Sequence, residues 1–241
     1  MPPFRYNAAF GKSQGEAGSH TMIRTLLLAI AAAGISTVAT SALAGESAPA
    51  NAAAKPDLDK AANTAKTVCA ACHGTDGNSA APVNPSIAGM PASYVALQLA
   101  HFKAGIRVNP VMQGIAATLS PEDMTALGVY FSQQKPKGLG ARDAALVQAG
   151  QKLYRGGDAA TGVPACAACH APDGAGIPRN YPRLAGQHAE YTLAQLKAFK
   201  TGERGNDKEG KDANGRIMAM IASRMSDVQM RAAAEYVQGL R

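Results

Sequence analysis

Cysteine is scarce in this sequence, and none is left over for disulfide bonds. Only four of the 241 residues are cysteine, and all four lie in two pentapeptides of the form Cys-x-x-Cys-His, at 69–73 and 166–170. This spacing indicates covalent haem attachment, in which two thiols hold the porphyrin edge and the adjacent imidazole reaches the iron. Since thioether bonds would consume every thiol, we predict two haem c groups and no disulfide.

Apolar runs long enough to cross a membrane are also lacking. The run from Leu26 to Val38 is shorter than the roughly 20 residues that a spanning helix needs. It follows the basic segment at Met22–Arg24 and precedes Ala42-Leu43-Ala44, which is the pattern of a cleaved secretory signal peptide. We therefore predict an upstream extension and signal peptide over 1–44, with the signal proper at 22–44. Cleavage near Ala44 would release the chain into the periplasm, with a flexible leader at 45–55.

Two further absences narrow the fold and the function. The formal net charge is +7 but aromatic residues make up only 5%, and no basic stripe with interleaved aromatics is present, so a nucleic-acid partner is not expected. Alternating β-branched runs are scarce, which argues against a sheet. We predict an all-α protein.

Internal repetition sets the architecture. The haem motifs are 97 positions apart, and the same offset carries Pro85–Gly89 onto Pro182–Gly186. Beyond 109 and 206 the offset grows to 106, so the second half carries an insertion, which we place at 207–215. Other residues that repeat at these two offsets are Tyr94, Gln98, Leu99, Phe102, Lys103, Gly105, Arg107, Met112, Ile115 and Ser120.

Each repeat is expected to fold as helices. The segment 94–105 predicts a helix that ends at a glycine, and Ser120 and Ser226 have the residues of N-terminal capping boxes. A linker with two glycines and a proline, Lys135–Gly140, separates the repeats. We predict an N-terminal domain at 56–136, a linker at 137–142 and a C-terminal domain at 143–241.

The fifth iron ligands follow from the motif, because His73 and His170 adjoin the anchoring thiols Cys69, Cys72, Cys166 and Cys169. Histidine is a poor candidate for the sixth ligand. His101 and His188 do not occupy equivalent positions in the two repeats. We interpret both as ordinary surface or helix residues.

Methionine suits the sixth position better, since a thioether raises the reduction potential relative to a second imidazole. Met112 and Met218 are equivalent, each three residues before Ile-Ala. Met220 is the rival in the second half, but it aligns with Gly114, which cannot ligate. Met124 and Met230 lie in predicted helices and are interpreted as core residues.

Other polar roles follow from position. The segments at Pro85 and Pro182 can supply a carbonyl to the proximal imidazoles. Four basic residues are candidates to bind the haem propionates: Lys103, Lys200, Arg107 and Arg204. A position at a solvent-exposed helix end explains these residues nearly as well.

The order of these motifs resembles class I cytochrome c: CxxCH, P-x-[IL]-A-G, QL-x-x-F-K-x-G-x-R, a methionine before Ile-Ala, and a serine-capped last helix. Its duplication is similar to the dihaem cytochrome c4 family. The resemblance implies two tandem haem domains related by a pseudo-twofold axis, with propionate edges facing across the interface. It also implies a periplasmic carrier, sometimes associated with the inner membrane, between a donor such as a cytochrome bc1 complex and a haem–copper terminal oxidase. The insertion before Met218 departs from the first repeat.

Three functions are compatible with two haem motifs. We favour a one-electron carrier that is not an enzyme and has no small-molecule substrate, since both irons would be saturated by His and Met. The alternative is an electron-transfer subunit of a periplasmic dehydrogenase, which would need the same domains. A dihaem peroxidase would require an open iron position, which the repeated methionines argue against.

Overall fold

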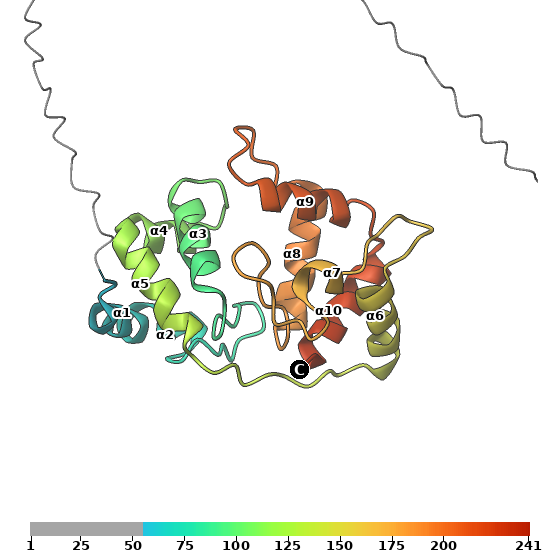
Figure 1. Cartoon of the computed structure of the whole chain (residues 1–241), viewed down its shortest axis with the longest axis horizontal. Helices are drawn as coiled ribbons and strands as arrows, with labels where there is room; N and C mark the ends of the chain where they lie inside the picture. The colour runs from blue at the N-terminus through green and yellow to red at the C-terminus, as the bar shows by residue number, and fades with distance from the viewer. Residues whose placement is uncertain (1–54) are drawn as a thin grey trace, which may run out of the picture. The chain divides into compact units, whose positions relative to one another are not determined.

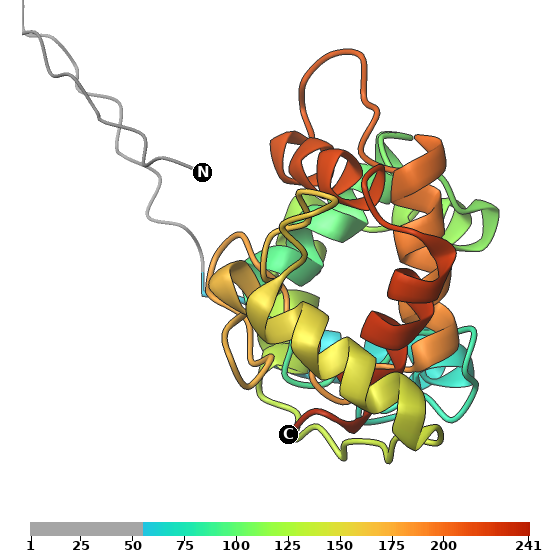
Figure 2. The same ribbon diagram turned by 90° about the vertical axis from the view of Figure 1, so that its right-hand side faces the viewer.

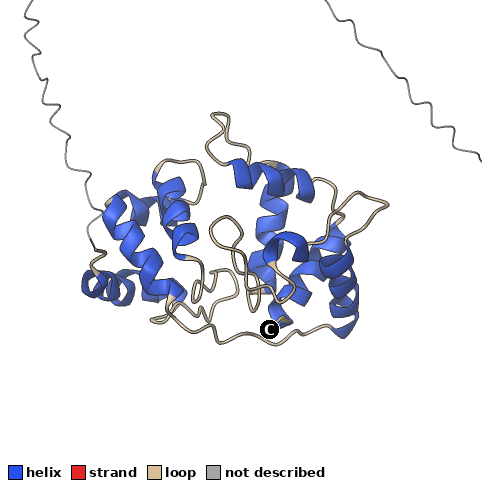
Figure 3. Ribbon diagram, viewed as in Figure 1, coloured by secondary structure: helices blue, strands red, loops and turns tan. Residues whose placement is uncertain are grey.

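The computed structural model describes residues 55–241, and this part of the chain is built from helices and loops (Figure 1, Figure 3). Within it the only β-type pairings are two isolated bridges, Asp158 with Val163 and Ile177 with Tyr181. The prediction of an all-α fold is confirmed. The predicted signal peptide, and all of the predicted leader except Lys55, lie outside the described residues. No helix within 55–241 combines the length and the apolar character needed to cross a membrane.

The helices fall into two successive sets. The first half contains α1 (Leu58–Thr64), the π-helical turn η1 (Ala65–Cys69), α2 (Ala70–His73), α3 (Ala92–Lys103), α4 (Pro110–Ala117) and α5 (Pro121–Ser132). The second half contains α6 (Ala144–Gly156), α7 (Ala167–His170), α8 (Ala189–Thr201), α9 (Ala213–Ala222) and α10 (Asp227–Gly239).

The predicted helix starts at the two serines are confirmed. Ser120 caps α5 in a reciprocal box with Asp123, and Ser226 caps α10 in the same way with Gln229. Each box satisfies two backbone N–H groups that a helix start would otherwise leave unpaired. The helix predicted at 94–105 is displaced by two residues, because α3 runs from Ala92 to Lys103 and Gly105 adopts a left-handed conformation beyond its end.

Each half packs its helices around its own apolar core. In the first half α3 and α1 pack on α5. In the second half α6 and α8 pack on α10 (Figure 2). Met124 and Met230 are almost completely buried in these cores, which confirms their predicted role. The cores thereby hold the short helical segments η1, α2 and α7, which carry the haem motifs.

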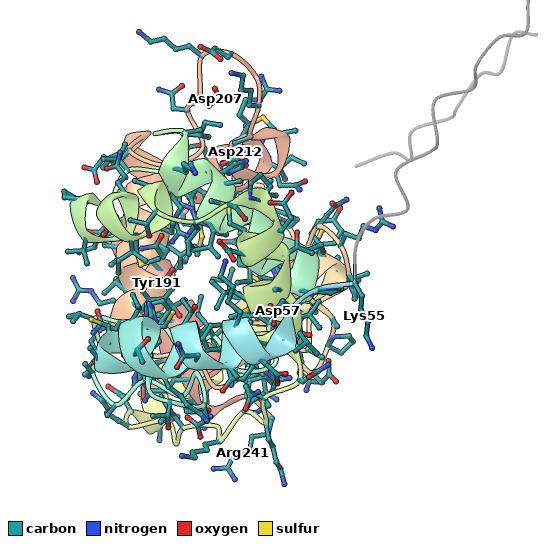
Figure 4. The ribbon with its side chains drawn as sticks, turned by 90° about the vertical axis from the view of Figure 1, so that its left-hand side faces the viewer. Lys55, Asp57, Tyr191, Asp207, Asp212 and Arg241 are labelled. Atoms are coloured by element: carbon teal, nitrogen blue, oxygen red, sulfur yellow. The ribbon has the colours of Figure 1, made fainter. Side chains whose placement is uncertain are left out.

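The insertion in the second half lies between α8 and α9. It forms a loop that leads to Asp212, whose carboxylate caps α9 by accepting a hydrogen bond from the backbone N–H of Gly215 at 2.9 Å. Asp207 binds the backbone N–H of Asp212 at 2.9 Å, and Figure 4 shows both carboxylates at the same end of the molecule. The last inserted residues therefore form the first turn of α9.

Candidate haem-binding cavity

One continuous cavity of about 1010 Å³ runs between the two halves. This volume is at the upper end of the range for ligand pockets. Its walls are largely apolar side chains, and they include all of the residues predicted to attach or ligate haem: Cys69, Cys72, His73, Met112, Cys166, Cys169, His170 and Met218. The fold thus brings both predicted ligand sets to one shared cavity.

The two motif histidines are held in the same way. Nδ1 of His73 lies 2.9 Å from the carbonyl oxygen of Pro85, and Nδ1 of His170 lies 3.0 Å from that of Pro182. The prediction that these proline segments supply a carbonyl to each imidazole is confirmed. A carbonyl can only accept, so Nδ1 carries the proton and donates, and Nε2 remains bare for a metal.

Burial affects the charge of these groups. It lowers the pKa of His73 and His170, against a smaller opposing effect of the carbonyl bonds, so both rings are neutral near pH 7 and can act as ligands. Burial also raises the pKa of the thiols of Cys69 and Cys166 to about 11. Cys72, by contrast, is exposed.

The candidate methionines differ in placement. Met112 and Met218 are half-buried, line the cavity and pack against the cores of their own halves. Met220 is 59% exposed and is not among the cavity-lining residues. The side chain of Met218 is therefore the better placed of the two to face a bound group.

Arg107 joins the first half to the second. Its guanidinium donates to Gln98 of its own half at 2.8 Å, and to Tyr191 and Gln195 of the other half at 2.7 and 3.0 Å. It also lies over the ring of Phe102, 4.6 Å from the centroid. Arg107 lines the cavity.

Arg204 makes the reciprocal set of contacts. It donates to Gln195 of its own half at 2.7 Å and to Tyr94 and Gln98 of the first half, both at 3.1 Å. Its guanidinium lies 4.4 Å from the ring centroid of Phe199. Each contact has its counterpart in the other repeat, as expected of two halves related by a pseudo-twofold axis.

The two lysines considered for the propionates are engaged elsewhere. Lys103 donates to the carbonyl of Leu119 and Lys200 to that of Met225. Each contact ties the end of one helix to the segment that precedes the next capping serine. Both lysines therefore have a structural role that repeats between the halves.

The sequence predicts that His101 and His188 are ordinary surface or helix residues; His101 does lie in α3 and His188 directly precedes α8, but neither is on the surface. They are 4% and 3% exposed. Nε2 of His188 lies 2.9 Å from the carbonyl of Ser79 in the opposite half. Gln187, beside it, exchanges two hydrogen bonds with the backbone of Ser86, at 2.8 and 2.9 Å. Their non-equivalence in the repeat, which is the argument against a shared ligand role, does not predict that they are buried.

Comparison with known proteins agrees with this arrangement. Residues 147–241 match the family described as Cytochrome c, and residues 56–131 match the family described as Cytochrome C oxidase, cbb3-type, subunit III. Cytochrome c4 of Azotobacter vinelandii is 41% identical over 226 residues, which cover 90% of this chain and 97% of that protein. This chain belongs to the cytochrome c4 family.

Two further similarities add detail to the cytochrome c4 assignment. The crystal structure of reduced recombinant cytochrome c4 from Pseudomonas stutzeri matches with a TM-score of 0.70 at 38% identity, covering 78% of this chain and all of that one. The thiosulfate dehydrogenase electron acceptor of Thiomonas intermedia is 41% identical and covers 70% of this chain and 76% of its own length. The chain is a dihaem electron carrier with two tandem cytochrome c domains, and its cofactors are two covalently bound haem c groups.

The cytochrome c4 cavity has the charges that haem requires. Arg107 and Arg204 line it, yet within residues 55–241 neither takes part in an ion pair and all their side-chain partners are neutral. The Nε atom of Arg183, another lining residue, is buried without a hydrogen-bond partner in the same part of the chain. Cations shielded from water are costly unless an anion compensates them. The carboxylates of haem are suitable anions, so the residues present fit the group.

Arg183 and Gln187 were missed from the sequence because each differs from its counterpart in the first repeat, Ser86 and Met90. The internal sequence repeat identifies residues with the same role in both halves, and it gives no information about residues that occur in one half only. Tyr94, Gln98 and their counterparts had a usable signal, since they repeat at the offset of the haem motifs, but the repeat alone does not indicate that they pair across the halves.

Proposed function

We propose that this cytochrome c4 is a periplasmic carrier that transfers single electrons from a respiratory donor, such as a cytochrome bc1 complex, to a haem–copper terminal oxidase. We further propose that His73 and Met112 are the axial ligands in the first half, and His170 and Met218 those in the second. The observation that carries the proposal is that both ligand sets face one cavity shared by the halves. Electrons could therefore pass within the molecule as well as to partners.

The residues of the chain have distinct tasks in this function. Haem, when bound, supplies a reversible one-electron couple. The carbonyls of Pro85 and Pro182 orient the imidazoles and strengthen them as donors. The thioethers of Met112 and Met218 would favour the reduced state and close the sixth position. With both positions closed, we expect no bond chemistry on a substrate and no catalytic residue.

The arginines keep the two halves in a fixed relation. Arg107 and Arg204 each bind glutamines of both halves, so a rotation of one half against the other would break several hydrogen bonds at once. Electron transfer within the protein depends on that fixed geometry. The apolar lining of the cavity excludes water, and this limits the reorganisation of solvent that accompanies a change in the charge of the haem.

Delivery to an oxidase can be tested with the reduced holoprotein and membranes that contain a haem–copper terminal oxidase. We expect rapid reoxidation that cyanide abolishes and that saturates with the concentration of carrier. The matched control is a preparation of the same membranes that lacks the oxidase. Reoxidation at an equal rate in both preparations would contradict the proposed acceptor.

One observation favours a second function. The similarity to a thiosulfate dehydrogenase electron acceptor, at 41% identity, supports a carrier or subunit that receives electrons from a periplasmic dehydrogenase. In that case the oxidised protein should be reduced by thiosulfate only when the dehydrogenase is present, and it should co-purify with a larger chain. A free carrier would elute near its own mass.

A further inference from the structure

Gln187 is a buried side chain of the second half that reaches the backbone of the first half. It is 5% exposed and lines the haem-binding cavity. Its Oε1 accepts hydrogen bonds from the backbone N–H groups of Ser86 at 2.9 Å and His188 at 3.1 Å, and its Nε2 donates to the carbonyl of Ser86 at 2.8 Å. These partners determine the orientation of the amide, because a backbone N–H can only donate and a carbonyl can only accept.

The backbone N–H of Ser86 belongs to the same peptide group as the carbonyl of Pro85. That carbonyl accepts the hydrogen bond from Nδ1 of His73 at 2.9 Å. Gln187, this peptide group and His73 therefore form one continuous chain of hydrogen bonds. The chain begins in the second half and ends at the proposed axial ligand of the first half.

A hydrogen bond at one end of a peptide group strengthens the bond at its other end. When Oε1 of Gln187 accepts from Ser86, it polarises the peptide group and leaves more negative charge on the carbonyl oxygen of Pro85. A stronger acceptor holds the Nδ1 proton of His73 more tightly and makes Nε2 a better donor to a bound metal. Since better donation stabilises the ferric state, the chain should lower the reduction potential.

The second half lacks such a chain. The counterpart of Gln187 in the first half is Met90, which packs in the core of its own half and has no N–H group to donate. The equivalent peptide group joins Pro182 to Arg183. Its carbonyl binds His170 at 3.0 Å, but within residues 55–241 no hydrogen bond joins its N–H to another residue. The two proximal histidines thus share one kind of acceptor, and only the acceptor in the first half is polarised from behind.

We propose that Gln187 is a positioning residue for the haem of the first half, and that its hydrogen bond to the Pro85–Ser86 peptide group lowers the reduction potential of that haem alone. The inference rests on the proposed ligation by His73. No bond of the chain is made or broken when an electron arrives. This contribution favours the second half as the place of an electron that the two haems share.

The experiment is a redox titration of the holoprotein followed by NMR, which detects the ring protons of His73 and His170 separately and so gives each haem its own potential. Gln187→Met introduces the residue of the first half and removes both hydrogen bonds to Ser86. The reduction equilibrium constant of the first-half haem should rise about two- to fivefold, as expected for the loss of polarisation in one hydrogen bond. This corresponds to about 20–40 mV for one electron. The potential of the second-half haem should stay the same.

Gln187→Glu is the conservative variant, because it keeps an oxygen that accepts from the N–H of Ser86. It should leave the potential of the first-half haem at or below the wild-type value. Entry of water through a loosened interface would stabilise the more highly charged ferric state and lower the potential, so a rise in Gln187→Met separates loss of the chain from loss of packing. Haem absorption spectra confirm that the variants are folded and loaded. An equal rise in Gln187→Glu and Gln187→Met would overturn the proposal.

The matched control is His188→Leu. It removes the neighbouring hydrogen bond from Nε2 of His188 to the carbonyl of Ser79 but keeps the backbone N–H that binds Gln187. Both potentials should stay at their wild-type values. The proposal fails if His188→Leu raises the first potential as much as Gln187→Met does, or if Gln187→Met leaves that potential unchanged.

The same spectra separate this inference from the ligand assignment on which it rests. In the oxidised wild-type protein the Nδ1 proton of His73 should be strongly shifted by the iron, and Gln187→Met should change that shift. Absence of the shift in the wild-type protein would contradict ligation by His73 itself. A shifted proton that Gln187→Met does not affect would contradict the hydrogen-bond chain alone.

Discussion

In the first half, α1 continues through η1 directly into the Cys69 pentapeptide, whereas in the second half a loop at 157–165 separates α6 from Cys166. The second half also contains the insertion at 207–215. In addition, the side chains of Gln187 and His188 in the second half form hydrogen bonds with the backbone of the first half. Within residues 55–241, Met90 and Pro91 of the first half make no equivalent hydrogen bond to the second half. The predicted haem ligands and the arginine contacts between the halves are therefore duplicated, while the contacts of Gln187 and His188 belong to the second half alone.

The largest effect is expected from the sixth ligands. Met218→Ala should abolish the methionine–ferric haem charge-transfer band of one haem and lower the potential of that haem alone, because a thioether favours the reduced iron. Met112→Ala should do the same for the other haem. Absorption spectroscopy of the oxidised holoprotein measures both.

Met220→Ala is the control for this comparison. Its side chain is 59% exposed, so the variant should keep both bands at full intensity. Loss of a band in Met220→Ala together with retention in Met218→Ala would reverse the ligand assignment.

The second comparison concerns the packing of the first helix of each half. Gly150 in α6 is buried against α10, and a Cβ at this position would lie 2.0 Å from the carbonyl oxygen of Ala232. α1, which packs on α5, has the buried Ala61 instead. Gly150→Ala should lower the free energy of unfolding by about 1–3 kcal/mol, since the backbone of α10 must move. Thermal or denaturant unfolding of the holoprotein measures the loss.

Gly156→Ala is the matched control in the same helix, because no atom outside its own helix backbone and chain neighbours lies within 4 Å of a Cβ there. It should be neutral or should stabilise by less than about 1 kcal/mol. Equal losses in both variants would show that helix composition, and not the close approach to α10, is responsible.

Much of this architecture could be predicted from the sequence because it is local or repeated. The capping boxes at Ser120 and Ser226 depend on residues three apart, and the haem motifs on residues within a pentapeptide. The contact between Arg107 and Tyr191 joins positions 84 apart, and no local pattern reports such a pairing. His101 lies in the last turn of α3 and is 4% exposed, and its polar side chain gave no sign in the sequence that it would be buried.

The third prediction tests whether the halves contribute equally to their interface. Arg107→Ala removes three hydrogen bonds and leaves Tyr191 and Gln195 without that donor, which should cost about 1–2 kcal/mol. Arg204→Ala should cost a similar amount. The two arginines share Gln98 and Gln195, so the double variant should lose less than the sum of the single variants.

Arg224→Ala is the control, since Arg224 donates only within the second half, to the carbonyl of Gly162. Its loss of stability should be smaller and additive with that of Arg107→Ala. Strict additivity between Arg107 and Arg204 would indicate that the two sets of contacts are independent and that the network is not one unit.

The smallest expected difference lies in the two capping boxes. In the first half the third helical residue is Asp123, whose carboxylate binds Lys60 and the backbone N–H of Ser120, and these contacts lower its pKa below 3.8. A carboxyl with a lowered pKa in the folded protein stabilises it above its unfolded pKa, and this contribution is lost as the pH falls through the folded pKa. In the second half Gln229 has the same position and does not titrate.

Asp123→Asn should thus reduce stability by less than about 1 kcal/mol at pH 7 and should cease to do so in strong acid. Ser226→Ala, which removes the neutral cap hydrogen bond to the backbone N–H of Gln229, should instead cost about the same at both pH values, as measured by denaturant unfolding. If Asp123→Asn and Ser226→Ala respond identically to acid, the charged pair with Lys60 contributes nothing that a neutral cap does not.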